Sequence, residues 1–154
     1  MTETVEFIAM SADLEPACSL IAETLAAGER AYGRPHGGEA PSATAAEMAP
    51  PDGAFFVAYE HGLPVACGGL KRFDDETAEI KRMYVTPQAR SRGFGRSLLS
   101  TLEAEARRLG YRYARLDAGP RSHHARALYE SAGYAAIPAY NHNPLAAYWA
   151  EKRL

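Results

Sequence analysis

The chain has 154 residues, of which 47% are hydrophobic, and a formal net charge of −2. This length lets one domain bury a core, so we expect residues 1–154 to form a single domain. The near-neutral charge argues against nucleic-acid binding, which normally needs a basic surface. No apolar run approaches the roughly 18 residues of a membrane span, and the acidic first residues do not resemble a signal peptide. We therefore expect a cytoplasmic protein that binds neither nucleic acid nor a membrane.

Cysteine and histidine are sparse and scattered along the chain. Cys18 and Cys67 are the two cysteines, and no CxxC pair occurs. The five histidines lack the i, i+4 spacing of a helical metal site, and no cysteine cluster accompanies them. The sequence therefore predicts no metal site and two small, buried thiols.

The first third of the chain predicts a strand, a helix and a long connection. Residues 5–10 alternate in part, which is typical of a strand. Apolar residues over 17–25 recur at helical spacing, and Ser11 or Asp13 can cap this helix. The segment 33–53 is rich in Gly, Pro and Ala, and connections of this length are usually functional or mobile.

Three β-rich runs follow, at residues 54–59, 64–70 and 78–86. A tight hairpin turn separates the first two, with Gly62 supplying a positive φ. Pro87 stops the third run, because proline cannot donate to a strand ladder. The pattern predicts an antiparallel meander of three strands.

The C-terminal half predicts alternating helices and strands. Apolar residues over 98–109 mark one face of an amphipathic helix that ends at Gly110. The pattern then predicts a strand, a short helix and two further strands, at residues 111–117, 122–132, 134–137 and 146–153. A meander followed by strand–helix alternation indicates an α+β or mixed α/β domain.

The loop before the amphipathic helix contains two glycines, Gly93 and Gly95. Glycine lets backbone approach a ligand, and the first N–H groups of a helix have no intrahelical partner, so that together with the helix dipole they form an anion site. Arg90, Arg92 and Arg96 add positive charge around it. The loop therefore predicts a phosphate-bearing ligand, although two glycines would also suit a sharp turn.

Spacing excludes two common phosphate-binding loops. A dinucleotide fingerprint needs a third glycine where this chain has Leu98, and a P-loop needs a Gly-Lys-Ser/Thr triplet that does not occur. The spacing of the glycines alone therefore does not identify the phosphate-bearing ligand.

Three segments resemble motifs of the GNAT acetyltransferases, in the same order. Arg90-x-x-Gly-x-Gly95 resembles their R/Q-x-x-G-x-G/A motif, residues 79–87 resemble their fourth strand, and residues 125–134 resemble their A-x-x-L/F-Y-E-x-x-G-F/Y segment. The resemblance covers residues 54–134 well and the N-terminal half by element order. It implies the mixed α/β GNAT fold, whose mostly antiparallel, twisted sheet of about six to seven strands is splayed between strands 4 and 5 and flanked by helices.

The resemblance also implies acetyl-CoA as co-substrate and no metal. In the family, the pyrophosphate sits on backbone amides, here 92–97, and the pantetheine arm pairs with the fourth strand, here 83–85. Many relatives carry Asn where this chain has Ser122, which can still cap a helix and donate a hydrogen bond. The residues that we expect to bind the cofactor are Met83, Tyr84, Val85, Arg90, Ser91, Arg92, Gly93, Phe94, Gly95, Arg96, Ser97, Ser122 and Tyr129.

Two residues are the candidate catalytic groups. By resemblance Tyr129 is the general acid for the leaving thiolate, since free thiols have a pKa of roughly 8.5, but it also fits the buried face of a short helix. Glu79 is the candidate base, directly or through a water, although a strand carboxylate is often a solvated surface group. The N–H of Met83 could stabilise the oxyanion. Because relatives commonly bulge in this strand, alternation does not decide whether Glu79 or Lys81 points into the cleft.

The segment 137–145 resembles the C-terminal part of one group of small GNAT proteins. Tyr140, Asn141 and His142 would then reach the acceptor side of the site. Equally, residues 141–144 would suit a turn before the last strand.

The resemblance favours an N-acetyltransferase that moves an acetyl group to the primary amine of a small molecule or amino acid by direct attack in a ternary complex. A protein or peptide N-acetyltransferase and a non-catalytic acyl-CoA-binding regulatory module are the alternatives. Tyr129 and Glu79 favour catalysis over the last of these, and a small stand-alone domain favours a small acceptor. The sequence does not identify the acceptor, and it does not decide whether the protein is a monomer or a homodimer.

Overall fold

The structure is a computed structural model that describes residues 5–32, 43–119 and 123–154. Within these residues, seven strands form one open, mixed sheet in the order β1-β2-β3-β4-β5-β7-β6. The elements are β1 (Val5–Ala9), α1 (Ala17–Tyr32), β2 (Ala54–Glu60), β3 (Leu63–Arg72), β4 (Thr77–Val85), η1 (Pro87–Ala89), α2 (Phe94–Arg108), β5 (Tyr113–Ala118), α3 (His123–Ser131), β6 (Ala135–Ala136) and β7 (Tyr148–Arg153).

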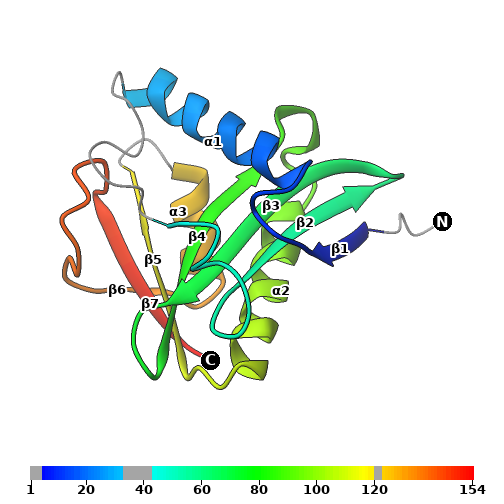
Figure 1. Cartoon of the computed structure of the whole chain (residues 1–154). Coiled ribbons are helices and arrows are strands. Elements are labelled where there is room, and N and C mark those ends of the chain that lie inside the picture. Colours follow the sequence, from blue (N-terminus) through cyan, green and yellow to red (C-terminus); the bar gives the residue numbers. More distant parts are fainter. Residues whose placement is uncertain (1–4, 33–42, 120–122) are drawn as a thin grey trace.

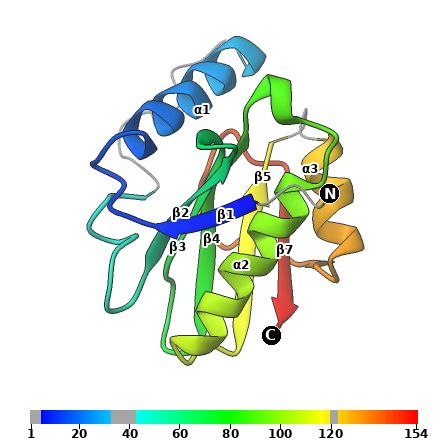
Figure 2. The same cartoon turned by 90° about the vertical axis from the view of Figure 1, so that its right-hand side faces the viewer.

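Helices cover both faces of the sheet (Figures 1 and 2). The helix α1 lies on one face, while α2 and α3 lie on the other. Each face has its own apolar cluster because side chains alternate along a strand. Leu20 of α1 joins the cluster that holds Phe55 and Cys67, whereas Leu98 of α2 joins the cluster that holds Ile80. This architecture confirms the fold class expected from the sequence.

The strands β1 to β4 pair antiparallel in succession, which confirms the predicted meander. His61 and Gly62 form the hairpin turn with φ values of 50° and 77°. A turn with two positive φ angles matches the twist of the flanking strands. Gly62 therefore has the conformation that the sequence predicted for it.

One local prediction was wrong, and another gave a strand that is too long. Neither Ser11 nor Asp13 caps α1, because the Ser11 hydroxyl accepts the N–H of Asp13 in a local turn and the helix begins only at Ala17. The strand predicted at 134–137 is reduced to Ala135–Ala136.

The sheet opens between β4 and β5. These two strands are parallel, and their pairing covers only Thr77–Glu79 against Tyr113–Arg115. Beyond this short ladder they diverge (Figure 1), and α3 crosses the space between them in this view. The strand β4 thus pairs with β3 along most of its length, whereas after Glu79 its other edge has no strand partner among the described residues.

A bulge in β4 lies at the point of divergence. Between the pairs Cys67–Tyr84 and Gly69–Lys81, β3 advances two residues while β4 advances three. Arg82 lies in this step and has a φ of 60°, in the left-handed region. One extra residue shifts the alternation of side chains on one strand of a pair. The residues on either side of Arg82 therefore cannot be assigned to a face from the sequence pattern alone.

Candidate active site

The glycine loop ends at the N-terminus of α2 in a geometry suited to an anion. Gly93 is the N-cap residue with φ 87°, and Ser97 donates its N–H to the Gly93 carbonyl at 3.1 Å. The N–H groups of Phe94, Gly95 and Arg96 precede this first intrahelical bond and so have no acceptor within the helix. A β-carbon built on Gly93 would meet no atom within 4 Å in the described part of the chain. The loop therefore presents backbone donors to open space.

The two glycines of the loop serve different purposes. Gly93 is needed for its left-handed conformation, which side chains rarely adopt. Gly95 is needed for packing, because a β-carbon there would lie 3.2 Å from Leu128 of α3. The neighbouring side chain of Phe94 is buried in the core. The motif thus sets the backbone of the loop and also brings α3 against α2.

The arginines around the loop contact the protein itself. The Arg90 Nε donates to the Val85 carbonyl at 3.0 Å, and Arg92 Nη1 donates to Glu60 at 3.0 Å. Arg96 donates to the hydroxyl of Ser131 on α3. The positive charge predicted for this region is present, and these contacts fix it near the N-terminus of α2.

The open edge of β4 continues from this loop. Thr86 donates its N–H to Val65 of β3 at 2.9 Å, so the preceding Val85 directs its own N–H and C=O away from β3. The same edge has no strand partner after Glu79. The side chain of Met83 lies on the α2 face, against Gly68, while Tyr84 packs with the cluster under α1.

Glu79 and Lys81 both lie on the face of the sheet opposite α2. They are 4% and 7% exposed, and Lys81 Nζ lies 3.1 Å from Glu79 Oε2. The Tyr140 hydroxyl donates to the same oxygen at 2.7 Å. Burial and the adjacent Glu79 carboxylate raise the pKa of Tyr140, so its phenol remains a hydrogen-bond donor. Glu79 and Lys81 thus share one face of the sheet, where they form an ion pair with each other.

Asp117 extends this polar cluster from β5. Its Oδ2 lies 3.9 Å from Lys81 Nζ and accepts a hydrogen bond from Asn141 Nδ2 at 2.7 Å. Asn141 in turn accepts the indole N–H of Trp149 at 2.9 Å, and it also accepts the backbone N–H of Asn143 at 3.2 Å. Asn141 therefore both forms the turn that the sequence allowed and joins the cluster. We call Glu79, Lys81, Asp117, Tyr140 and Asn141 the buried polar cluster.

Aromatic contacts fix the position of Tyr140. The guanidinium of Arg115 lies 4.9 Å from the centre of its ring and 4.4 Å from that of Phe73. The two rings pack edge to face with centroids 5.2 Å apart. Arg115 also pairs with Glu151 of β7. These contacts hold the segment before β7 against the sheet, and His142 within it is exposed.

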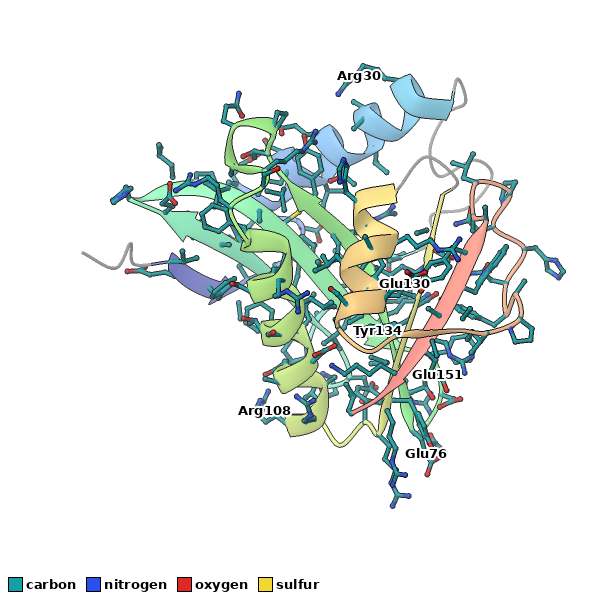
Figure 3. The ribbon with its side chains drawn as sticks, turned by 180° about the vertical axis from the view of Figure 1, so that it is seen from behind. Arg30, Glu76, Arg108, Glu130, Tyr134 and Glu151 are labelled. Carbon is teal, nitrogen blue, oxygen red and sulfur yellow. The ribbon has the colours of Figure 1, made fainter. Side chains whose placement is uncertain are left out.

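Tyr129 of α3 is 6% exposed, and its ring packs edge to face on that of Tyr134 with centroids 5.9 Å apart. Figure 3 shows α3 in front of the divergence of β4 and β5, with Tyr134 just beyond the end of the helix. Burial first, and then the Asp117 carboxylate, raise the pKa of Tyr129 to about 12. Tyr134 donates to Glu103 at 2.9 Å, whereas the Tyr129 hydroxyl has no hydrogen-bond partner among the described residues. Tyr129 is thus both a packed helix residue and a protonated phenol that can still donate.

The family model of the acetyltransferase (GNAT) family matches residues 21–134. The chain belongs to the GNAT family. It is 40% identical over 90 residues to the IAA acetyltransferase of Azospirillum brasilense, an alignment that covers 57% of this chain and 58% of that protein. The chain thus spans less than two thirds of the length of the curated relatives that it matches.

Solved structures agree with the family assignment. A Klebsiella pneumoniae protein proposed to be an acyl-CoA N-acyltransferase superposes with a TM-score of 0.78, at 26% identity and over 98% of both chains. The PaiA N-acetyltransferase of Thermoplasma acidophilum, solved in complex with coenzyme A, superposes with a TM-score of 0.72 at 18% identity, over 98% of this chain and 99% of that one. The likeness to the second protein concerns the fold.

The GNAT site gathers most of the predicted residues but not all. The loop from Arg90 to Ser97 follows Met83–Val85 along the chain, and the α3 residue Leu128, next to Tyr129, lies against Gly95 of the loop. Ser122 lies outside the described residues. Asp117 and Arg82 were not predicted as site residues. Asp117 lies near the end of a strand, two residues after Arg115. This position is only a weak sequence signal, because the side chains that contact Asp117 come from other parts of the chain.

The described residues contain no group of His, Cys, Asp and Glu side chains that could hold a metal ion. Among the helices of the same residues, none has the length and apolar character needed to cross a membrane. Cys67 is buried, and burial raises the pKa of its thiol to about 12. A thiol with this pKa is not a nucleophile near neutral pH.

The hydrogen bond from Tyr140 to Glu79 should stabilise the fold. We expect Tyr140→Phe to lower the free energy of unfolding by about 1.5–3 kcal/mol, because a hydrogen bond to a buried carboxylate is lost while the ring contacts remain. Tyr113→Phe is the matched control, since no hydrogen bond joins its hydroxyl to the rest of the described chain, and it should change stability by less than about 0.5 kcal/mol. Urea unfolding of both variants measures this, and equal effects would contradict the assignment.

Proposed function

We propose that the chain is an acetyl-CoA-dependent N-acetyltransferase that transfers an acetyl group to the primary amine of a small molecule or amino acid, by direct attack in a ternary complex. The observation that carries this proposal is the continuity of three features, namely the donor-rich loop at α2, the unpaired edge of β4 and the phenol of Tyr129. Family membership supports acetyl transfer from acetyl-CoA as the reaction.

The residues present fit the cofactor. Of the amides of Arg92 to Ser97, that of Ser97 already bonds the Gly93 carbonyl, so those up to Arg96 would hold the pyrophosphate, where Gly93 leaves open space beside the helix N-terminus. The edge of Met83 to Val85 would pair with the pantetheine arm, because no strand of the described part of the chain pairs with these residues on that side. When bound, acetyl-CoA supplies an acyl group activated as a thioester. These contacts are mostly made by backbone, which agrees with the engagement of Arg90 and Arg96 elsewhere.

Proton transfers fall to two side chains. Tyr129 would donate a proton to the departing thiolate, and its raised pKa keeps the phenol protonated at neutral pH. Glu79 would accept the proton of the attacking ammonium, directly or through a water. Lys81 and Tyr140 both contact its Oε2, while its Oε1 has no hydrogen-bond partner among the described residues. The N–H of Met83 is our candidate donor to the oxyanion.

Thiol release from acetyl-CoA tests the proposed reaction directly. We expect release to depend on an added amine, across a panel of simple amines, amino acids and short peptides, and mass spectrometry should find the acetylated amine. Amino acids or small amines should be better substrates than peptides. Acetylation of peptides alone would favour the protein N-acetyltransferase alternative, and tight CoA binding without any acetylated product would favour the non-catalytic one.

Tyr129→Phe tests the acid. We expect kcat to fall by about 10²–10⁴-fold, because general acid catalysis contributes this much, while CoA affinity changes little. Since the pKa is about 12, the wild type should show no loss of kcat from phenol ionisation as the pH rises from 8 to 10. The measurement is a pH profile of both proteins with chemistry limiting. An unchanged kcat in the variant would remove Tyr129 as the acid.

Gly93→Val tests the loop. Valine at a φ of 87° adds about 1–3 kcal/mol of strain, and relief of that strain by movement of the loop should weaken CoA binding about tenfold or more. Gly62→Val is the matched control, because Gly62 also has a positive φ and open surroundings but lies in the β2–β3 hairpin. Calorimetric titration with CoA compares the variants, and wild-type affinity in Gly93→Val would show that the loop does not bind the pyrophosphate.

A further inference from the structure

Arg82 is a half-buried cation that lacks a carboxylate partner in the described residues. Its Nη2 makes one long hydrogen bond, 3.4 Å from the Ala43 carbonyl. Other buried and half-buried cations of the described residues pair with carboxylates, as in Lys81–Glu79, Lys71–Glu47, Arg115–Glu151 and Lys152–Glu103. Burying a charge without a partner costs free energy. Burial accordingly lowers the pKa of the Arg82 guanidinium.

Arg82 lies close to the candidate active site. Its left-handed φ makes the bulge at the point where β4 leaves β5. Ala43 belongs to the apolar cluster under α1, so the guanidinium lies on the α1 face. The Arg82 carbonyl accepts a hydrogen bond from Cys67 Sγ at 3.5 Å, which is part of the same cluster. Arg82 therefore stands beside the open edge of β4 and on the face that bears the buried polar cluster.

A cation without a carboxylate partner suits an anionic ligand, and for Arg82 that ligand is not the pyrophosphate of the cofactor. The loop that would hold the pyrophosphate begins α2, and α2 packs on the other face of the sheet. Arg90 and Arg96 already supply positive charge there. A ligand that meets Arg82 must instead approach from the α1 face.

Glu79 and Arg82 lie three residues apart on the same strand, about 10 Å along the backbone. The first is a carboxylate that can attract or deprotonate an ammonium group, and the second is a guanidinium. An acceptor lying along this face would find one charged end opposite each residue. A planar guanidinium binds a carboxylate with two parallel hydrogen bonds, which favours this anion over others of less matching shape.

We propose that Arg82 binds the carboxylate of the acceptor, so that the substrates are amines that also carry a carboxylate, as amino acids do. This inference rests on the proposed function and narrows its acceptor class. Arg82 would be a specificity-determining residue that does not take part in proton transfer. The lack of a carboxylate partner for Arg82 among the described residues then has a reason, because the substrate supplies the missing charge.

Paired acceptors test the proposal. Each amino acid in a panel is compared with its own carboxamide, which keeps the amine and the side chain but removes the negative charge. We expect the wild type to prefer the acid by about 10–100-fold in kcat/KM, mostly through KM. Arg82→Gln should abolish this preference while leaving the carboxamide almost unchanged, and Arg82→Lys should restore part of it. Each substitute keeps a β-carbon, so the backbone strain at this position stays similar.

Controls separate recognition from folding. Arg72→Gln removes an exposed arginine at the far end of β3 and should leave the acid preference intact. Arg82→Gln should also keep its Tm and its CoA affinity, because it removes a charge that has no carboxylate partner among the described residues and makes only one long hydrogen bond. Equal loss of activity towards acid and carboxamide, or a wild type that does not distinguish them, would overturn the proposal.

A binding measurement keeps this inference separate from the proposed reaction. CoA-loaded protein is titrated with N-acetyl amino acids and with their carboxamides, and the rise in Tm is followed. We expect the acids to stabilise the wild type more than the amides, and Arg82→Gln to remove the difference. This result together with no acetyl transfer to any amine would refute the proposed function but retain the carboxylate site. Acetyl transfer to amines together with equal binding of acids and carboxamides would retain the proposed function but refute the carboxylate site. Acetyl transfer together with binding of neither acids nor carboxamides would have the same meaning.

Discussion

The open site depends on the single bulge in β4. A left-handed residue at Arg82 adds one position opposite β3, and the alternation of side chains changes there. Lys81 and Arg82 consequently lie on the α1 face, while Met83 lies on the α2 face. Just beyond the short ladder with β5, β4 still pairs with β3 but no longer pairs with β5. Backbone groups that a regular sheet would use in a ladder are thereby left for a ligand.

Side chains maintain the separation of β4 and β5 where the backbone ladder is absent. Lys81 reaches towards Asp117 across the divergence, and Tyr140 connects Glu79 to the segment before β7. Removing such charges from water is costly, and their mutual attraction offsets the cost only when hydrogen bonds satisfy the remaining oxygens. Tyr140 and Asn141 provide those bonds. The cluster can therefore hold the strands apart at a defined distance without a ladder.

Most of the fold could be predicted from the sequence because each element has a local pattern. The meander, the amphipathic helix α2 and the glycine loop lie where periodicity and glycines predicted them. The faces of Glu79 and Lys81 could not be predicted, since a bulge of one residue inverts the pattern that would assign them. Asp117 was missed because its role comes from strands adjacent in space but separated in sequence. Arg82 was missed because a charge without a partner is visible only once its neighbours are placed.

Cofactor and acceptor depend on different kinds of interaction in this site. The loop before α2 offers backbone N–H groups, which any residue except proline supplies, and so substitutions there act through conformation. Arg82 offers a side chain, and a change of that side chain alters one charge without moving the loop. On the proposed assignment, a single substitution on the α1 face of β4 would change the acceptor preference of this chain while the cofactor site is retained. The Arg82 guanidinium, which has no carboxylate partner among the described residues, is the local feature that makes this separation testable.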